Sequence, residues 1–493
     1  MKINTLSYRL LLVCMTMLLS FSELYAQKKQ VTVNWDKVVM VSKTTPTLQV
    51  VVNPMLYRNS YIHKEVFDAL KKLGADYVRF VPWYPYPHMA VAELEPPSGS
   101  KTFWDFSKID PIVEDFMEAT KGHSIVMDFS TIPEWMFETE QKITYSDDPD
   151  EVNWNYKQGR KFRDTTLKEL TDYYSRLLSW YTKGGFTDEL GKYHKSGHSY
   201  TFPFWEILNE PDLEHQFSVQ EYTRIYDAMV IAMKKISPEM KFIGMSLARG
   251  NDPGWFEYFL DSSNHTDGVK PEAISYHFYG KPEFKEQTIE NYQYAFYSKA
   301  NAFLDRVRFI ENIRMRLAPH CMTYINEIGN ILGDQQGTSI PDDYWNLSGG
   351  MFAYIYIELA KMGIHVAGES QLIGYPTQFP DVTMINWKNG QPNARFLVLK
   401  LLKDNFGPGD KMMLTETDSK DIAAQAFISG KIKRLLLINK TNKVIEIDLS
   451  NEVKNAEVFS VNTSSGNQIE NSKLTGTGIT LLPFAVSVIQ LKN

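Results

Sequence analysis

The sequence predicts an α/β fold, a (β/α)8 TIM barrel followed by a C-terminal β-sandwich domain. Three observations lead to this prediction. Eight short β-rich runs alternate with amphipathic helical segments, as expected for a parallel barrel. From about residue 411 the pattern changes to alternating strand-like runs separated by Asn, Gly and Ser. The length of 493 residues suits one large barrel and one smaller domain.

The first residues have the pattern of a secretory signal peptide. Lys2 and Arg9 supply positive charge, Leu10–Phe21 is a short apolar run, and Ala26 precedes a cleavage site. The apolar run falls well short of the roughly 20 residues that a membrane-spanning helix needs. We therefore expect residues 1–26 to be removed on export to the periplasm or the extracellular space, and no membrane span elsewhere.

The barrel strands are expected where short apolar, β-branched runs alternate with helical periodicity. The eight candidate strands are Leu48–Val52, Tyr77–Val81, Ser124–Phe129, Phe202–Leu208, Lys241–Met245, Ala273–Phe278, Met322–Asn326 and His365–Ser370. Helices are expected at Lys64–Leu73, Ile109–Thr120, Thr165–Tyr181, Val219–Ile236, Tyr297–Leu317, Gly349–Met362 and Pro392–Asn405. The barrel is thus expected over residues 45–409.

The β-sandwich domain is expected over residues 410–493. Its candidate strands are Ile432–Asn439, Val444–Leu449, Ala456–Val461, Gly478–Leu482 and Ala485–Leu491. Within the N-terminal segment 27–44, Gln30–Val39 is also strand-like. Because so small a domain would otherwise leave its strand edges exposed, we expect Gln30–Val39 to pair with it.

Composition excludes several classes of protein. A net charge of −7 without a dense block of Lys and Arg argues against nucleic-acid binding. After export the chain would keep a single cysteine, Cys321, so no internal disulfide is expected. Spacings typical of zinc ligands are absent from the sequence, and neither a metal nor an organic cofactor is expected. The 10 Trp, 27 Tyr and 28 Phe suit a carbohydrate partner, although most aromatic residues should fill cores.

The strongest chemical signal follows the fourth candidate strand. Phe202–Leu208 runs into Asn209-Glu210-Pro211, where proline ends the strand as the chain leaves the barrel. Catalytic residues of barrel enzymes stand at the C-terminal ends of the strands. Glu210 could protonate a glycosidic oxygen there while Asn209 holds a sugar hydroxyl. A chance turn, or an acidic residue at a helix N-terminus, would give the same tripeptide.

A second glutamate follows the seventh candidate strand. Met322–Asn326 leads directly into Glu327. Glycoside hydrolysis needs two carboxyl groups flanking the anomeric carbon, and the ends of strands four and seven face each other across a barrel mouth. The Asn–Glu pair is weak evidence alone. Together with Glu210 it predicts a glycosidase site built on two carboxyl groups.

This pair of strand ends resembles clan A of the glycoside hydrolases, and most closely family 39, which holds β-xylosidases and α-L-iduronidases. The strand-four pattern of that family, close to F-E-x-W-N-E-P-D, is similar to Phe204–Asp212. Phe103–Phe106 and Phe129–Trp135 resemble the residues around its third strand. The resemblance implies that Glu210 is the acid/base and Glu327 the nucleophile.

Three positions depart from the family pattern. Leu208 stands where the family has tryptophan before Asn-Glu-Pro, and Asn326 stands where it has threonine before the nucleophile. Trp83 follows the second candidate strand where the xylosidases of the family place a histidine. These changes keep the catalytic pair and leave the sugar and the exact family open.

Further side chains are candidates for the same site. The resemblance implies that His277 and Tyr279 hydrogen-bond the nucleophile and the sugar, and that Arg79 keeps the nucleophile ionised. Arg79 could instead pair with Glu206 deeper in the barrel. Candidates for stacking on the sugar or binding its hydroxyls are Trp83, Trp104, Trp135, Trp387 and Glu369. Core packing or loop capping is the alternative for each of them.

The pattern favours a retaining glycosidase that cleaves O-glycosidic bonds of plant or host saccharides by double displacement, xylosidase-like or a related exo-glycosidase. An inactive carbohydrate-binding barrel would not need two matched glutamates. A metal-dependent barrel hydrolase would need clusters such as His-x-His after the first strand. An inverting enzyme would hold its carboxyl groups roughly 6.5–9.5 Å apart, against 5–5.5 Å in a retaining one. A uronide substrate would need a basic residue, for which Lys388 and Arg395 are candidates by position.

Overall fold

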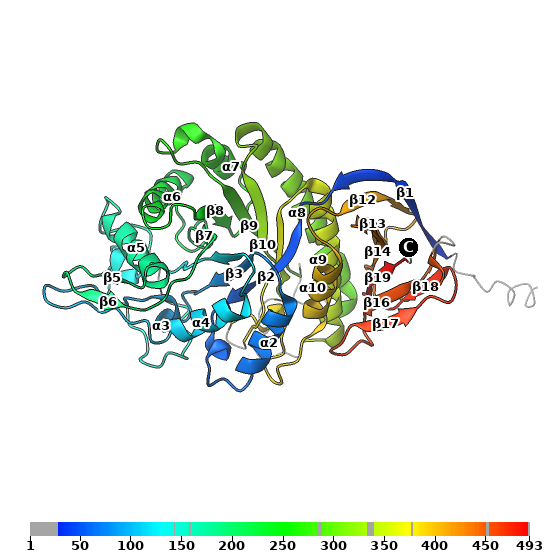
Figure 1. Cartoon of the computed structure of the whole chain (residues 1–493), viewed down its shortest axis with the longest axis horizontal. Helices are drawn as coiled ribbons and strands as arrows, with labels where there is room; N and C mark the ends of the chain where they lie inside the picture. The colour runs from blue at the N-terminus through cyan, green and yellow to red at the C-terminus, as the bar shows by residue number, and fades with distance from the viewer. Residues whose placement is uncertain are drawn as a thin grey trace, which may run out of the picture.

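The computed structural model describes residues 28–491, apart from 142, 157–158, 283–287, 333–339, 376–377 and 450–452. The expected signal peptide, residues 1–26, lies outside the described residues. Figure 1 shows a barrel ringed by helices beside a smaller sheet domain, which contains both the blue N-terminal strand and the red C-terminal strands. None of the helices in this described part is both long and apolar enough to cross a membrane.

The larger part is a closed barrel of eight parallel strands, which confirms the predicted (β/α)8 architecture. In chain order the strands are β2 (Thr45–Val51), β3 (Val78–Val81), β4 (Ile125–Met127), β7 (Phe204–Glu206), β8 (Lys241–Leu247), β9 (Ala273–Gly280), β10 (Met322–Asn330) and β11 (Val366–Glu369). β11 pairs with β2 and closes the barrel, with Val366 opposite Thr45. The strands are buried on both faces, which explains their near-continuous apolar runs.

Helices connect the strands on the outside of the barrel. The longer ones are α2 (His63–Leu73), α4 (Asp110–Ala119), α5 (Lys168–Thr182), α6 (Val219–Lys234), α7 (Pro253–Leu260), α8 (Ile289–Leu317), α9 (Asp342–Met362) and α10 (Ala394–Asn405). Shorter elements are η1 (Pro54–Leu56), α3 (Pro87–Ala90), η2 (Glu134–Met136), β5 (Gly185–Thr187), β6 (Tyr193–Lys195), η3 (Ser262–Asn264) and η4 (Pro380–Val382). Local sequence sets their ends: Ser218 and Glu221 form a capping box at the start of α6, and Gly74 ends α2 with a left-handed φ of 58°.

Each predicted barrel strand overlaps an observed one, but some ends differ. β7 stops at Glu206, before the predicted end at Leu208, because Leu208 adopts a left-handed φ of 64°. β10 continues beyond Asn326 to Asn330, paired with β9. Helix α7 was not among the predicted helices; it is only eight residues long, and its buried side chains are Trp255, Phe256, Phe259 and Leu260.

The smaller part is a mostly antiparallel sheet domain, as predicted. Its nine strands run in the order β17–β16–β19–β14–β13–β12–β1–β15–β18. Their bounds are β1 (Lys29–Val41), β12 (Lys411–Thr417), β13 (Ile422–Ser429), β14 (Ile432–Asn439), β15 (Ile445–Asp448), β16 (Glu457–Val461), β17 (Glu470–Lys473), β18 (Gly478–Leu481) and β19 (Val486–Gln490). β1 pairs antiparallel with β12 and, at Lys29 and Gln30, parallel with β15. Strands β12, β13 and β17 were not among the sequence candidates.

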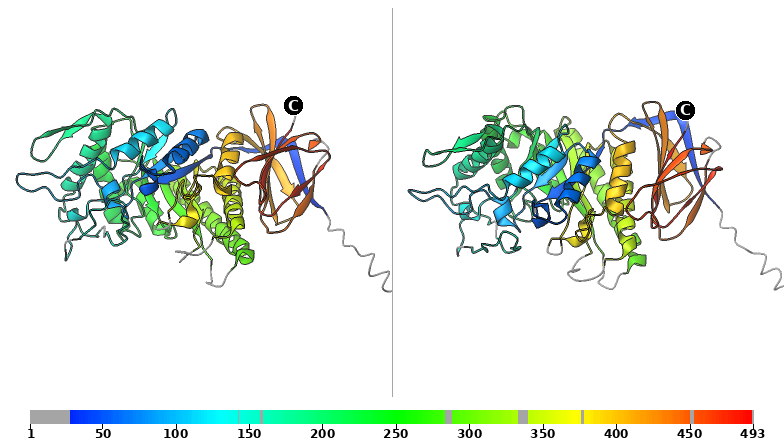
Figure 2. Two further views of the ribbon diagram at one scale, coloured as in Figure 1. Left: turned by 90° about the horizontal axis from the view of Figure 1, so that it is seen from below. Right: turned by 60° about the horizontal axis from the view of Figure 1, so that its bottom comes forward.

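The sheet domain packs against the barrel through alternate residues of its strands. On β14, Leu436 and Ile438 belong to the core that is continuous with the barrel helices, while Leu435 and Leu437 belong to a second core with β15 and β18. This separation follows from the two-residue period of a strand. In both views of Figure 2, α9 and α10 lie between the barrel and the sheet domain. The sheet domain therefore packs against the barrel at its last two helices, α9 and α10.

Candidate active site

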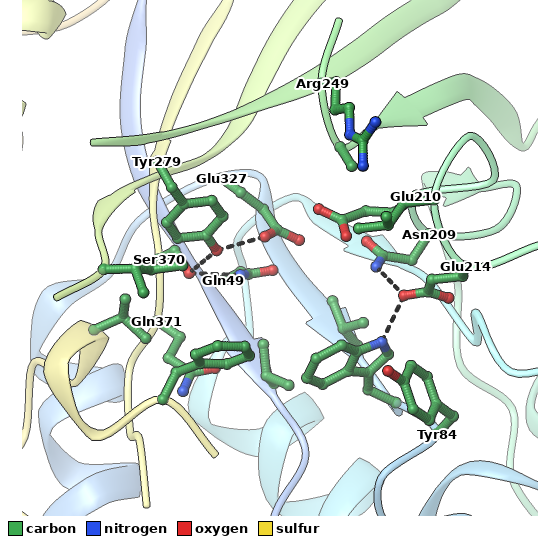
Figure 3. A pocket seen from close by; sticks show the side chains of 18 of the residues that line it. Gln49, Tyr84, Asn209, Glu210, Glu214, Arg249, Tyr279, Glu327, Ser370 and Gln371 are labelled. Atoms are coloured by element: carbon green, nitrogen blue, oxygen red, sulfur yellow. Dashed lines mark hydrogen bonds between the residues drawn. The ribbon is translucent and has the colours of Figure 1, made fainter. Parts of the chain in front are cut away.

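The carboxyl ends of the barrel strands surround a cavity of about 710 Å³, a size typical of small-molecule sites. Figure 3 shows Glu210 and Glu327 facing each other across it. Other side chains that line it include Gln49, Trp83, Tyr84, Trp154, Asn209, Glu214, Arg249, Tyr279, Lys281, Ser370 and Phe379. This is the end of the barrel at which enzymes of this fold place their catalytic residues.

Glu210 stands just past β7 on an unusual stretch of backbone. Leu208 and Glu210 both have positive φ, at 64° and 43°, a conformation that costs a non-glycine residue about 1–2 kcal/mol. Two hydrogen bonds hold this stretch of backbone in place. The Glu210 amide donates to the Ser246 carbonyl over 2.9 Å, and the Tyr222 hydroxyl donates to the Ile207 carbonyl over 2.9 Å. Such strain is characteristic of functional sites, and here it turns the Glu210 side chain into the cavity.

Glu327 lies within β10, next to a local irregularity of its pairing with β9. Tyr324 is opposite Ser275 and Glu327 is opposite His277, so β10 carries one more residue than β9 over this step. A bulge of this kind re-aims side chains. Oε2 of Glu327 accepts a hydrogen bond from the Tyr279 hydroxyl over 2.6 Å. Both carboxylate oxygens are therefore held, since Oε1 accepts from Arg79 over 2.6 Å.

Arg79, on β3, is the centre of a buried polar network beneath the cavity. Its guanidinium pairs with Glu327, with Asp128 over 2.6 Å and with Glu206. Arg79 thus contacts both of the carboxylates that the sequence suggested for it, Glu327 and Glu206. Burial acts to lower the pKa of Arg79, but the three carboxylates outweigh it and raise that pKa. The guanidinium is therefore a permanent positive charge.

The neutral members of the same network fix its geometry. Oε1 of Gln49 and Oδ1 of Asn209 accept from Arg79 over 2.6 and 2.8 Å. Nδ2 of Asn326, which precedes the second glutamate, donates to both oxygens of Glu206 over 2.8 and 3.0 Å. Asn326 thus holds the Glu206 carboxylate in place below the cavity.

His277, on β9, joins the two glutamates. Its Nδ1 lies 2.8 Å from Oε1 of Glu210, and its Nε2 lies 3.1 Å from Oγ of Ser246 and 3.6 Å from Oε1 of Glu327. Burial acts to lower the pKa of His277, but the charges of Glu327 and Glu210 and the hydrogen bond with Glu210 outweigh it and raise that pKa. A positive charge on His277 is therefore favoured between the two carboxyl groups.

The two glutamates are shifted in opposite directions. Burial raises the pKa of Glu210 above its usual value, with His277 opposing and the charge of Glu327 adding to the rise. Burial also acts to raise the pKa of Glu327, but His277, Arg79 and the Tyr279 hydroxyl outweigh it and lower that pKa. One carboxyl group is thus favoured as a proton donor and the other as an anion, the division of roles that acid/base and nucleophile require.

The same residues form the one cluster among the described residues that could hold a metal ion. Glu210, His277 and Glu327 each offer one ligand atom, and these atoms lie within 4.8 Å of one another. However, Arg79 and Tyr279 already bind the two oxygens of Glu327, and His277 binds Glu210. A divalent ion would be placed against the guanidinium of Arg79, so the cluster is better suited to proton transfer.

Not all of the predicted substrate-binding residues reach the cavity. Trp83, Asn209 and Tyr279 line it, while Arg79 and His277 lie directly beneath. Trp135, Glu369 and Trp387 are not among its described lining residues. Each has another setting, as do Trp104, Lys388 and Arg395.

Packing and pairing explain where these residues are. Glu369 is fully buried and accepts from Arg395 over 2.9 Å, an ion pair behind the site instead of a sugar contact. The indole of Trp135 donates to the Glu93 carbonyl over 2.8 Å and stacks under Arg163. Trp104 packs against Phe106, Tyr173 and Phe186, whereas Lys388 is exposed and Trp387 is half-buried. In the sequence, the size and charge of these side chains did not distinguish them from the residues that line the cavity.

Several residues that line the cavity were not among the candidates from the sequence. Glu214 follows Glu210 by one helical turn, a spacing that could have identified it. Trp154 and Phe379 come from long loops after β4 and β11, and Phe379 stacks on Trp83 with ring centroids 6.2 Å apart. Nothing in their local sequence indicates that these loops return to the strand ends.

Comparison with solved structures places the fold among those of clan A glycoside hydrolases. A family 51 arabinofuranosidase from Xanthomonas axonopodis pv. citri aligns with a TM-score of 0.65 at 12% identity, over 94% of this chain and 100% of that one. An α-L-arabinofuranosidase from Thermotoga maritima, in an arabinose complex, gives 0.61 at 16% identity over 94% and 100%. A family 39 β-xylosidase from Caulobacter crescentus gives 0.59 at 15% identity over 94% and 99%. At these identities the likeness concerns the fold.

The sequence itself matches no family model and no curated protein. No family is therefore shown for this chain, and the chemistry of the site follows from its own residues.

Proposed function

We propose that this protein is a retaining glycoside hydrolase with Glu327 as nucleophile and Glu210 as acid/base. The observation that carries the proposal is the pair itself. An oxygen of each carboxyl group lies within 4.8 Å of the other, and their pKa values are shifted in opposite directions. Retaining enzymes hold these groups roughly 5–5.5 Å apart, whereas inverting ones leave roughly 6.5–9.5 Å for a water. The spacing supports direct attack by Glu327.

The reaction would proceed in two displacements. In the first, an oxygen of Glu327 attacks the anomeric carbon, the bond to the leaving oxygen breaks, and Glu210 gives that oxygen its proton. In the second, Glu210 takes a proton from water, the water oxygen attacks the anomeric carbon, and the ester to Glu327 breaks. Arg79 and Tyr279 would stabilise the carboxylate of Glu327 as it is released.

The aromatic wall of the cavity supports a sugar substrate. Trp83 is stacked with Phe379 at an interplanar angle of 26° and meets Trp154 edge-on at 5.5 Å. Aromatic faces of this kind stack on the C–H faces of sugar rings. We propose a xylosidase-like or related exo-glycosidase, because the sequence motifs resemble family 39 and the structural neighbours include an arabinofuranosidase and a β-xylosidase.

The experiment that tests this function is a panel of aryl glycosides. Xyloside, arabinoside, glucoside, galactoside and iduronide would be compared side by side with the purified mature chain. Release of the aryl group from at least one of them, lost in Glu327→Gln, is the expected result. Binding of sugars without turnover of any glycoside would instead indicate a carbohydrate-binding barrel.

We also propose that the protein acts outside the cytoplasm. The proposal rests on the signal-peptide pattern of residues 1–26. N-terminal sequencing of the protein secreted by its expression host tests it, with a mature chain that begins at Gln27 as the expected result. An unprocessed chain retained in the cytoplasm would contradict it.

A further inference from the structure

The cavity contains a third carboxyl group, on Glu214, which the two-carboxylate mechanism does not use. The Glu214 amide donates to the Glu210 carbonyl over 2.8 Å, so the two residues lie on one turn of chain. Both side chains line the same cavity, as Figure 3 shows. Glu214 also lines a neighbouring hollow with Glu138 and Arg160. It therefore stands where the active-site cavity continues outward.

Glu214 accepts hydrogen bonds from two N–H donors of the cavity wall, which would otherwise face a bound sugar. Its Oε1 accepts from the indole Nε1 of Trp83 over 2.7 Å and from the amide Nδ2 of Asn209 over 2.8 Å. Oδ1 of Asn209 is engaged by Arg79. Both ends of the Asn209 side-chain amide are thus hydrogen-bonded, to Arg79 and to Glu214. A sugar hydroxyl that approaches this wall therefore meets a carboxylate instead of an N–H donor.

The surroundings favour hydroxyl donors at this wall. Burial and the charges of Glu214 and Glu210 raise the pKa of Tyr84, so its hydroxyl remains protonated beside them. The positive side chains among the described residues of the cavity wall, Arg249 and Lys281, follow β8 and β9. A substrate anion would therefore be attracted toward those loops and repelled from Glu214. Like charges confined to one cavity repel strongly because little water separates them.

We propose that Glu214 is a specificity-determining residue, which accepts hydrogen bonds from hydroxyl groups of a neutral sugar and disfavours uronic acids. The proposal rests on the proposed glycosidase function. Trp83 and Asn209 position the carboxylate through their N–H groups, so the carboxylate, instead of these N–H groups, binds the sugar hydroxyls at this wall. A uronide carries its carboxylate at C5, so the neutral sugar and its uronide differ by the one group that Glu214 would discriminate.

The test compares Glu214→Gln with the unmodified protein on matched aryl glycosides. The glutamine keeps an oxygen for Trp83 and Asn209 but removes the charge. We expect kcat/KM for the best neutral glycoside of the panel to fall roughly 10- to 100-fold, mostly through KM, because a charged hydrogen bond becomes a neutral one. The ratio of kcat/KM for the neutral glycoside to that for its uronide should fall at least about tenfold.

The matched control is Glu138→Gln. Glu138 lines the neighbouring hollow, outside the active-site cavity, and pairs with Lys161. This substitution removes the same charge and should leave both kcat/KM values within about twofold, since exposed charges are screened. Equal losses on the neutral glycoside and the uronide in Glu214→Gln, or no loss on either, would overturn the proposal.

Failure of the proposed function can be told apart from failure of this inference. If the unmodified protein hydrolyses no glycoside of the panel, the proposed function fails. Calorimetric binding of the free neutral sugars and their uronic acids still tests Glu214 in that case. The same preference, reduced in Glu214→Gln, would support its role, whereas identical binding to both proteins would contradict it.

Discussion

Nη1 of Arg79 lies 2.6 Å from Oε1 of Glu327, which places a buried positive charge against the proposed nucleophile. The same guanidinium binds Asp128 and Glu206, so it also neutralises carboxyl groups beneath the cavity. The Arg79 side chain therefore contacts both the buried carboxylates inside the barrel and the carboxylate of Glu327 in the cavity. This double role makes Arg79 a residue whose replacement should change both stability and pH dependence.

Arg79→Lys should lower the free energy of unfolding by about 3 kcal/mol or more, because a single ammonium cannot bond three buried carboxylates at once. The pKa of Glu327 should rise, which moves the acid limb of kcat/KM to higher pH. Denaturant unfolding and a pH profile are the measurements. Arg395→Lys is the control, since it weakens a buried pair with Glu369 outside the cavity and should cost stability without moving that limb. An acid limb that moves equally in both variants would contradict the assignment.

Glu327→Gln should fold normally and lose activity on the order of 10⁴-fold or more, because an amide cannot form the glycosyl ester. The measurement is kcat on the best aryl glycoside, with circular dichroism to check folding. Retention of near-normal turnover would show that the nucleophile is another residue.

Glu210→Ala should affect substrates with poor leaving groups far more than activated aryl glycosides, which leave with little protonation. The expected difference between the two losses is about 10²-fold or more. Azide should restore turnover of the activated substrate by attacking the intermediate without base assistance. Similar losses on both kinds of substrate, with no effect of azide, would argue against an acid/base role.

The pH profile of kcat/KM should be bell-shaped. Activity falls at low pH as Glu327, whose pKa is lowered, takes up a proton, and falls at high pH as Glu210, whose pKa is raised, loses one. A positive charge on His277 lowers the pKa of both groups. His277→Asn should therefore move both limbs to higher pH.

The control for that variant is His265→Asn. His265 is also buried and bound to a carboxylate, Asp227, over 2.7 Å, but it lies outside the described wall of the cavity. It should leave both limbs in place. A profile of His277→Asn in which the limbs stay fixed, or move to lower pH, would contradict the proposed electrostatics.

Much of the barrel could be predicted from sequence because its strands are short, buried and separated by helical periodicity. The positions of Glu210 and Glu327 followed from the same reasoning, since strand ends converge at one rim. The bulge that sets Glu327 opposite His277 could not be predicted, because it depends on pairing between β9 and β10. Arg79 was open to two interpretations because a guanidinium has enough donors for both partners.

The course of the loops at the cavity could not be predicted from their local sequence. Trp154 and Phe379 reach the cavity through long connections that carry no periodic pattern. Conversely, Trp135 follows a predicted strand and Glu369 lies at the end of one, yet they pack against Arg163 and Arg395 and are not among the described lining residues of the cavity. A strand end limits where a side chain begins, but its partners decide whether it faces the cavity.

Direct attack of Glu327 on the anomeric carbon determines the stereochemistry of the product, so the anomer released first distinguishes it from attack by water. Proton NMR of the hydrolysis of the best aryl glycoside would be recorded from the first minute, before the free sugar mutarotates. With Glu327 as the nucleophile, the first-formed sugar should keep the anomeric configuration of the substrate, since two inversions give net retention. First appearance of the opposite anomer would rule out attack by Glu327 on the anomeric carbon, even if both glutamates proved essential.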